Sequence, residues 1–264
     1  MAGGGEMLLA IDVGNSKIGF GVWDGKAWAA GWQFPTRDAV IDALRLQGRI
    51  EAELRLAHVS SGIQEAILCS VAPEGARAVR AACDALGIKI RELMLGRQAG
   101  LEVGYERPEE MGADRVANAL GALAIARPPL IVVDFGTATT VDAIDRHGTL
   151  LGGAILAGGR LSARALAGGT AQLPEVELSA PEEAIGRSTR EAIQSGLVLG
   201  HAGAVDRLVK EFEAEVGRPT VIATGGLSGL FAPLCGSITR VEPQLTLRGL
   251  AAAAGKLRPL PGGR

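Results

Sequence analysis

The stretch LLAIDVGNS at Leu8–Ser16 decides the fold of the first half of this chain, and LIVVDFGTATT at Leu130–Thr140 repeats its plan almost half a chain later. In each stretch an apolar run ends at an aspartate that is followed by glycine and hydroxyl side chains. A continuous apolar run bounded by turn residues is typical of a buried strand. Asp12 and Asp134 are therefore predicted to lie where a strand enters a tight turn, and the repeat predicts a duplicated architecture.

The sequence around these turns predicts two similar halves. Residues 7–34 and 130–157 each read as three strands joined by tight turns, and Asp24-Gly25 is a typical hairpin turn. Helix and strand patterns then alternate in each half, which predicts an α/β fold with lobes over residues 7–120 and 121–257 and a boundary near 119–129. The expected helices are 37–56, 75–86, 112–126, 187–216 (interrupted near 200–203) and 245–256, and the further strands are 66–71, 88–95, 220–223 and 237–241.

Composition excludes several classes of protein. The net charge is −2 with mixed signs, and aromatic residues are only 3%, so neither a basic patch nor a base-stacking surface for nucleic acid is expected. No apolar run approaches the roughly 18 residues of a membrane span, and the N-terminus lacks a basic leader. We therefore expect a cytoplasmic protein. Cys69, Cys83 and Cys235 show no metal-binding spacing and are expected to be free thiols.

The first turn suggests a phosphate-binding loop. The P-loop pattern is absent, and no Gly-x-Gly-x-x-Gly follows a strand. A glycine turn between two strands, however, can aim backbone N–H groups at an anion. Gly14 would let the backbone approach the phosphate closely, and the side chains of Asn15, Ser16 and Lys17 would add hydrogen-bond donors. Asp12 would hold Mg²⁺ or its water shell. The alternative is an ordinary Asp-Gly turn.

The second turn strengthens this interpretation. Asp134 is followed by Gly136, Thr137, Thr139 and Thr140, and a hydroxyl-rich loop beside a carboxylate suits phosphate oxygens or a monovalent cation. Because threonine also favours strands, Thr139 and Thr140 are alternatively plain strand residues. Two such turns favour an enzyme that uses a nucleotide and holds its metal-bound phosphates.

A third acidic site precedes the helix expected at 112–126. Asp114 falls in its first turn, where the helix dipole favours a carboxylate. There it would act as the general base of a phosphoryl transfer, and Arg115 would pair with an anionic substrate group. The alternative is a charged helix start, with Asp114 as a cap and Arg115 solvated.

A last motif is the strand that runs into Gly225-Gly226 and then a helix. Two glycines allow a flat ring to lie against the backbone, so an adenine or ribose is a candidate ligand here. A tight strand-to-helix turn without a ligand is the alternative.

Taken together, these motifs resemble the type III pantothenate kinases of the acetate and sugar kinase/Hsp70/actin superfamily. The match in order and spacing covers residues 7–250, and the pair GADR and DFGTATT is its most specific part. The segments that carry the resemblance are DVGNS at 12–16, Tyr105–Arg115, DFGTATT at 134–140, IGRST at 185–189, TGGL at 224–227 and LTLRGL at 245–250.

The resemblance implies a fold and an activity. The fold is two duplicated ribonuclease-H-like lobes, with mixed five-stranded sheets flanked by helices and the active site in the interlobe cleft. The activity is the ATP-dependent phosphorylation of pantothenate, the first step of coenzyme A biosynthesis. Mg²⁺ would accompany the ATP, K⁺ or NH₄⁺ would serve as the monovalent cation, and the protein would be a homodimer with the acceptor site near the subunit interface.

The resemblance also assigns residues. It implies that Asp114 is the catalytic base and that Asp134 binds the monovalent cation. The ATP-binding positions are Asp12, Val13, Gly14, Asn15, Ser16, Lys17, Ile18, Gly19 and Thr137, to which we add Gly225 and Gly226. The pantothenate-binding positions are Tyr105, Gly112, Ala113, Asp114, Arg115 and Thr189.

Two departures from the family pattern stand out. Ala157 replaces a proline that usually ends the third strand of the second half, and Lys17 stands where asparagine is common. Lys17 either contacts phosphate or faces solvent. Two other functions remain open: a catalytically inactive relative that binds or regulates a partner, and a kinase for another small hydroxy acid or sugar.

Overall fold

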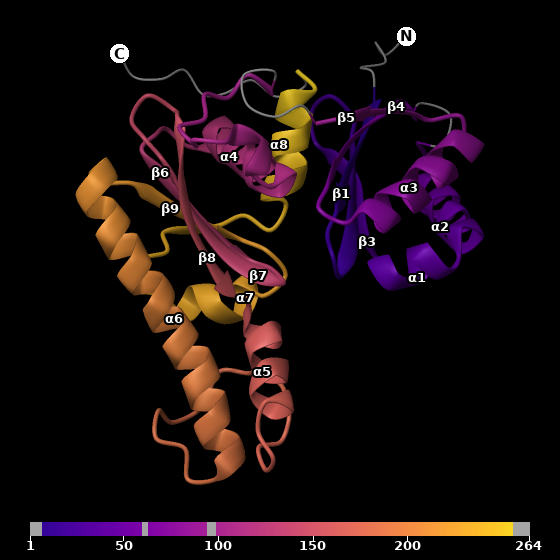
Figure 1. Cartoon of the computed structure of the whole chain (residues 1–264). Helices are drawn as coiled ribbons and strands as arrows, with labels where there is room; N and C mark the ends of the chain where they lie inside the picture. Colours follow the sequence, from indigo (N-terminus) through magenta and orange to yellow (C-terminus); the bar gives the residue numbers. More distant parts are fainter. Residues whose placement is uncertain (1–6, 60–62, 94–98, 256–264) are drawn as a thin grey trace. The chain divides into compact units, whose positions relative to one another are not determined.

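The structure, a computed structural model, describes residues 7–59, 63–93 and 99–255 (Figure 1). The described chain forms two compact units. The first contains the residues up to Glu102 together with Glu106–Ile125 and the helix α8 (Leu245–Ala253), and the second contains Val103–Tyr105 and Ala126–Gln244. These units differ from the predicted lobes in that α8 belongs to the first unit, Val103–Tyr105 belong to the second, and the boundary falls after Ile125. The expected helix and strand ends at residues 256 and 94–95 lie outside the described residues.

The first unit is built on a five-stranded mixed sheet with the order β3-β2-β1-β4-β5. The first three strands are antiparallel, whereas β4 and β5 run parallel to β1. The strands are β1 (Met7–Val13), β2 (Lys17–Trp23), β3 (Trp28–Pro35), β4 (Ile63–Ser70) and β5 (Lys89–Glu92). The helices are α1 (Thr36–Ile41), α2 (Ala43–Leu56), α3 (Pro73–Ala85) and α4 (Ala113–Ile125), which a short 3₁₀ turn, η2 (Pro108–Glu110), precedes.

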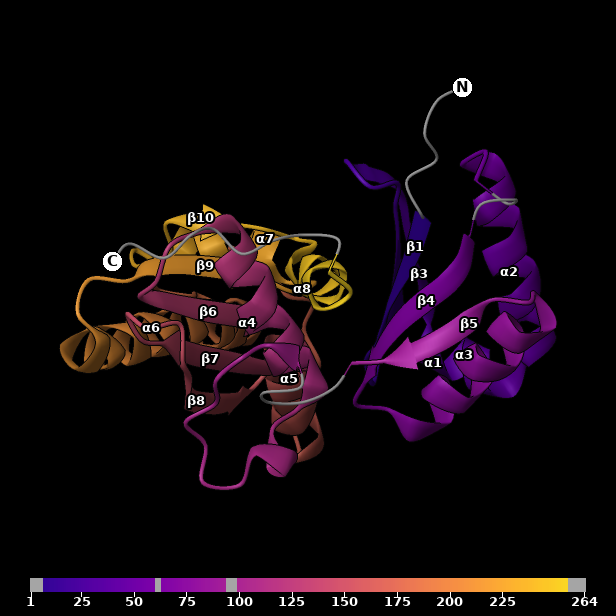
Figure 2. The same cartoon turned by 90° about the horizontal axis from the view of Figure 1, so that it is seen from above.

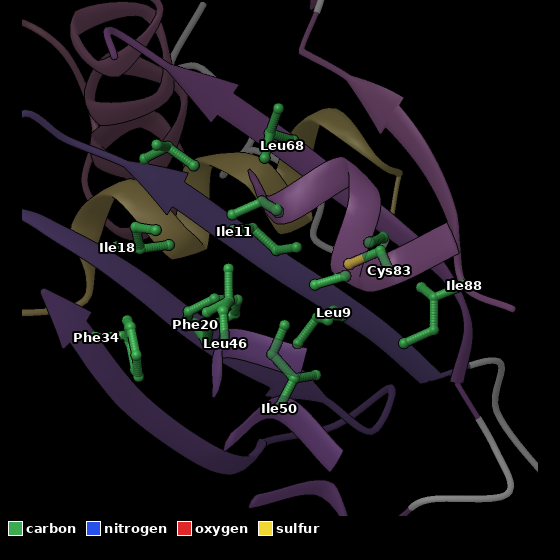
Figure 3. Packing of buried hydrophobic residues seen from close by; sticks show 14 of the residues in the cluster. Leu9, Ile11, Ile18, Phe20, Phe34, Leu46, Ile50, Leu68, Cys83 and Ile88 are labelled. Carbon is green, nitrogen blue, oxygen red and sulfur yellow. The ribbon is translucent and has the colours of Figure 1, made fainter. Parts of the chain in front are cut away.

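Alternating side chains give this sheet two different faces. Leu9, Ile11 and Phe20 point to the face that carries α1, α2 and α3, where they pack with Leu46 and Ile50 (Figures 2 and 3). Residues at odd and even positions of a strand point to opposite faces. Asp12 therefore faces the other side of the sheet, which α8 covers.

The second unit repeats the plan of the first, with the strand order β10-β9-β6-β7-β8. Its strands are β6 (Leu130–Phe135), β7 (Ala138–Ile144), β8 (Leu150–Ala157), β9 (Thr220–Thr224) and β10 (Arg240–Val241). Its helices are α5 (Gly159–Gly168), α6 (Thr189–Val216) and α7 (Ser228–Phe231), with a 3₁₀ turn, η3 (Ala232–Leu234). The prediction of two mixed five-stranded sheets flanked by helices is confirmed.

Two helix predictions were wrong in detail. The helix expected at 37–56 is broken at Asp42, whose carboxylate accepts the N–H of Arg45 and so starts α2 as a new helix. Conversely, α6 is continuous through Gly200 and Gly203. The burial of Val198 and Val205 against the second sheet offsets the cost of about 1 kcal/mol that each helical glycine carries.

Candidate active site

The first acidic turn is a three-residue loop, Gly14–Ser16, between β1 and β2. The N–H of Gly14 donates to the carbonyl of Lys17 at 2.9 Å. Thr36, at the start of α1, holds the loop at two points: its Oγ1 donates to the Gly14 carbonyl at 2.7 Å and its N–H to the Ser16 carbonyl at 3.1 Å. Thr36 is only 5% exposed, and sequence reasoning did not identify it.

The predicted ATP-binding residues of this turn fall into two groups. Val13 and Ile18 are buried in the core, so only their backbone can serve a ligand. Asn15, Ser16 and Lys17 are exposed at the tip of the loop. The ammonium of Lys17 donates to Gln33 Oε1 at 3.1 Å, which places it over β3.

Asp12 lies in a row of side chains that crosses the sheet. It pairs with Gly19 on β2 and with Cys69 on β4. Paired residues of neighbouring strands point to the same face, so the missing side chain of Gly19 leaves space beside the Asp12 carboxylate. On the other side, the Cys69 thiol donates to Asp12 Oδ1 at 3.3 Å.

The third acid, Asp114, lies in the first turn of α4 as predicted. Its Oδ1 accepts the N–H of Arg115 at 2.8 Å, and a side chain at Gly112 would collide with the same carboxylate. Burial raises the pKa of Asp114, and the hydrogen bond and charge of Arg115 offset this only in part. Arg115 is 5% exposed, so the alternative of a solvated arginine was wrong.

Asp12, Cys69 and Asp114 belong to one electrostatic cluster. Burial raises the pKa of the Cys69 thiol well above its ordinary value, and the carboxylates of Asp12 and Asp114 both add to this rise. The fold of the first unit therefore brings together the two acids that the sequence predicted, with a buried thiol beside them.

The second acidic turn is shorter and holds Asp134 tightly. Gly136 and Thr137 connect β6 to β7, and the N–H of Gly136 donates to the Ala138 carbonyl at 3.1 Å. A side chain at Gly225, where φ is +90°, would overlap Asp134 Oδ1. Because only glycine fits there, the two predicted motifs at 134–140 and 224–227 meet at this carboxylate.

The two threonines after this turn have different roles. Both are strand residues of β7, as the alternative interpretation held. Thr139 is buried on the α6 side, where its Oγ1 lies 2.9 Å from His201 Nε2. Thr140 pairs with Asp134 and shares its face, and Thr224 pairs with Asp134 from the other side. Thr140 and Thr224 therefore point to the side of the sheet that the Asp134 carboxylate occupies, whereas Thr139 points to the opposite side.

The predicted acceptor residues Tyr105 and Thr189 both belong to the second unit. The ring of Tyr105 lies against Gly152, where φ is +131° and a Cβ would sit 3.2 Å from Cε2 of the ring. Thr189 begins α6, after the N-cap Ser188, and lines a mostly apolar hollow of about 450 Å³ between α5 and α6. Two of the predicted ATP-binding residues, Thr137 after Gly136 and Gly226 after Gly225, are exposed.

Two broader findings bear on function. In the part of the chain that the structure describes, no helix combines the length and apolarity needed to cross a membrane. The cysteines Cys69, Cys83 and Cys235 are buried free thiols, which confirms that prediction.

The fold defines the class of protein. With 19% identity, the chain resembles a proposed 2-dehydro-3-deoxygalactonokinase from Sinorhizobium meliloti with a TM-score of 0.59, over 97% of this chain and 98% of that one. It resembles component A of (R)-2-hydroxyglutaryl-CoA dehydratase from Acidaminococcus fermentans with a TM-score of 0.54 and 16% identity, over 96% and 98% of the two chains. The duplicated mixed sheets with acidic turns thus place the protein in the acetate and sugar kinase/Hsp70/actin fold class.

Sequence comparison narrows this class to one family. The family model for type III pantothenate kinase matches residues 8–211. A type III pantothenate kinase of Thermus thermophilus is 40% identical over 250 residues, which cover 92% of this chain and 97% of that protein. Another, from Rhodospirillum rubrum, is 41% identical over 249 residues, 92% and 96% of the two proteins. The chain belongs to the type III pantothenate kinase family.

Proposed function

We propose that the protein transfers the γ-phosphoryl group of ATP to the primary hydroxyl of pantothenate, which gives 4′-phosphopantothenate and ADP in the first step of coenzyme A biosynthesis. Beyond family membership, the observation that carries this proposal is the environment of Asp114. This carboxylate is half-buried, has a raised pKa, and its charge acts on Cys69, the partner of Asp12.

Asp114 acts as the general base. An alcohol is a poor nucleophile, and its proton must leave as the oxygen attacks phosphorus. A carboxylate whose pKa is raised toward neutrality accepts that proton more readily than an ordinary aspartate does. The N–H of Arg115 holds one carboxylate oxygen, which fixes the direction of the other. We assign Arg115 to the binding of pantothenate, together with Tyr105 and Thr189.

Asp12 and the Gly14–Ser16 loop serve the ATP phosphates. Among the described residues no group of three or more His, Cys, Asp or Glu side chains could form a metal cage. A single carboxylate fits Mg²⁺, which keeps several waters and is commonly shared between one or two carboxylates and phosphates. Bound Mg²⁺ supplies neutralisation of the phosphoryl charge, and Asp12 would hold it directly or through water.

Asp134 holds the monovalent cation, K⁺ or NH₄⁺. The support is a buried hydroxyl: Thr140 Oγ1 has no hydrogen-bond partner within the described residues, and it shares a face with Asp134. A buried polar atom without a partner is costly, and a cation at this place would satisfy it. Replacing K⁺ by Na⁺ is expected to lower the turnover number, measured at constant ionic strength. Equal rates in both salts would remove this role from Asp134.

The active protein is a homodimer. On α6, the small residues Ala192, Gly196, Gly200 and Gly203 form an exposed stripe opposite the buried valines. Within the described residues, no atom outside the adjacent turns of the helix comes within 4 Å of a Cβ built at any of the three glycines. Such a face allows a second helix to approach closely, and Thr189 begins the same helix.

A coupled assay tests the activity. Purified protein with ATP, Mg²⁺ and K⁺ should release ADP only when pantothenate is added, and mass spectrometry should find the phosphorylated product. A preference for a hexose or another hydroxy acid would replace pantothenate as the acceptor. If no acceptor supports ADP release, an inactive binding or regulatory relative becomes the better interpretation.

A further inference from the structure

Cys69 is a buried polar group that none of the predicted roles includes. It lies near the end of β4, is 2% exposed, and pairs with Asp12 across the parallel β1–β4 ladder. Its Sγ lies 3.3 Å from Asp12 Oδ1, within the distance expected for a thiol donor and a carboxylate acceptor. The thiol therefore contacts the carboxylate that is assigned to the metal–nucleotide complex.

The direction of this side chain distinguishes it from the other thiol of the first unit. Cys83, on α3, is fully buried in the apolar core on the opposite face of the sheet (Figure 3). Cys69 instead lies on the Asp12 face, in the electrostatic field of both Asp12 and Asp114. A small polarizable donor at that place stabilises a neighbouring carboxylate without adding a charge.

The duplication of the fold gives an independent comparison. In the second sheet, Thr224 of β9 pairs with Asp134 of β6 as Cys69 of β4 pairs with Asp12 of β1. Thr224 is 1% exposed, so both sheets place a small buried side chain with a donor at the strand end next to the turn aspartate. The two side chains differ chemically, but each can donate a hydrogen bond to its sheet's aspartate.

We propose that Cys69 is a positioning residue for nucleotide binding: its thiol hydrogen bond fixes the Asp12 carboxylate in the orientation that receives the magnesium–nucleotide complex. The inference rests on the proposed function, because it takes Asp12 as the group that faces the nucleotide. Cys69 itself touches neither substrate, and it forms no covalent bond in the reaction.

The test compares Cys69→Ala, which removes the donor, with Cys69→Ser, which keeps one. Titration calorimetry with MgADP measures binding without turnover, and steady-state kinetics separate the KM for MgATP from the KM for pantothenate. Cys69→Ala should weaken MgADP binding and raise the KM for MgATP roughly five-fold, as expected for one lost hydrogen bond. Its KM for pantothenate should stay within about two-fold of the wild-type value, and Cys69→Ser should restore most of the MgADP affinity.

Cys83→Ala is the matched control, because it truncates a buried thiol of the same unit on the other face. It should lower the thermal midpoint but leave MgADP affinity unchanged. Wild-type affinity in Cys69→Ala, or equally weak binding in Cys69→Ser, would overturn the proposal. If the wild-type protein binds MgADP but does not phosphorylate pantothenate, the proposed function fails while the MgADP comparison still decides the role of Cys69.

Discussion

Asp114 is subject to opposing effects that together set its protonation. Burial favours the neutral acid, whereas the N–H and the charge of Arg115 favour the carboxylate. Because burial is the larger effect, the pKa lies above the ordinary value of 3.8. The side chain of Asp114 therefore has a higher affinity for a proton than an ordinary aspartate, which suits a general base.

Asp114→Asn tests this balance through stability as well as activity. The variant should lose turnover, since the amide cannot take up the proton of the pantothenate hydroxyl. It should still bind MgADP. A carboxyl whose pKa is raised by folding stabilises the native state when protonated, and that contribution is lost as pH rises from about 3.8 through the raised value. The thermal midpoint of the variant should therefore exceed that of wild type at about pH 7, and the two should converge at about pH 3.5.

Calorimetric scans across this pH range measure the effect. A variant that is less stable than wild type at neutral pH would contradict the raised pKa. Turnover close to wild type would show that Asp114 is not the base.

Thr36 decides the shape of the phosphate loop although it lies outside it. Its hydroxyl and its N–H bind the carbonyls of Gly14 and Ser16. Thr36→Val keeps the volume and the N–H but leaves the Gly14 carbonyl without its donor. We expect the KM for MgATP to rise about five-fold, with little change in the KM for pantothenate, and Thr36→Ser to remain near wild type. Steady-state kinetics of the two variants check this, and equal defects in both would mean that Thr36 acts through packing alone.

At the scale of elements, the crossing of α4 and α8 fixes the helix that carries Asp114. A methyl group at Gly249 would overlap the Ala117 carbonyl, and one at Gly121 would overlap the Leu245 carbonyl. Between these contacts Thr246 donates to Asn118 Oδ1 at 2.7 Å. The backbones thus approach at two glycines, which explains why α8 belongs to the first unit.

Gly249→Ala should therefore be destabilising despite the higher helix propensity of alanine. Overpacking a close helix crossing typically costs about 1–3 kcal/mol. Gly48→Ala is the control, because Gly48 lies in a helix with open space at its Cβ and the change should stabilise by up to about 1 kcal/mol. Urea unfolding measures both variants, and a stabilised Gly249→Ala would disprove the close crossing.

At the scale of the whole molecule, the two units have the same strand order but differ in the loops and helices that surround the sheet. The loop after Asp12 has three residues and the loop after Asp134 has two. Only the second unit carries the long helix α6, whose N-terminal half extends beyond the sheet beside α5 (Figure 1). A duplicated core has thus acquired an extension in one copy, and this extension presents the small-residue stripe that we assign to the dimer.

Gly200→Lys tests that assignment. A lysine on the stripe should prevent close approach of a second helix and give a monomer in sedimentation velocity experiments. MgADP binding should persist, while the KM for pantothenate should rise if the acceptor site needs the partner. Gly48→Lys, on an exposed helical face of the first unit, should leave the assembly unchanged. An unaltered dimer in Gly200→Lys would place the interface elsewhere.

Much of this could be predicted because it depends on local pattern. Apolar runs that end at Asp12 and Asp134 predicted both strand ends, and Asp114 was found because its place in a first helical turn is readable from neighbouring residues. The expected break in α6 was wrong because glycine propensity is weaker than burial of the valine stripe. The helix α5 was not predicted at all, although its residues 159–168 are amphipathic and bury Gly159 and Ala163.

The sequence by itself determined the duplicated strand–turn–strand plan, the family and the identity of the three acids, because periodicity and turn chemistry act between near neighbours. Only the tertiary structure decided what surrounds those acids. Thr36 forms a hydrogen bond with Gly14, 22 residues away in the sequence. The hydrogen bond from Cys69 to Asp12 spans 57 residues, and the one from Thr246 to Asn118 spans 128 residues. Such contacts depend on the register of paired strands and on the crossing of helices. Both are established only when distant segments pack together, so they cannot be predicted from local sequence patterns.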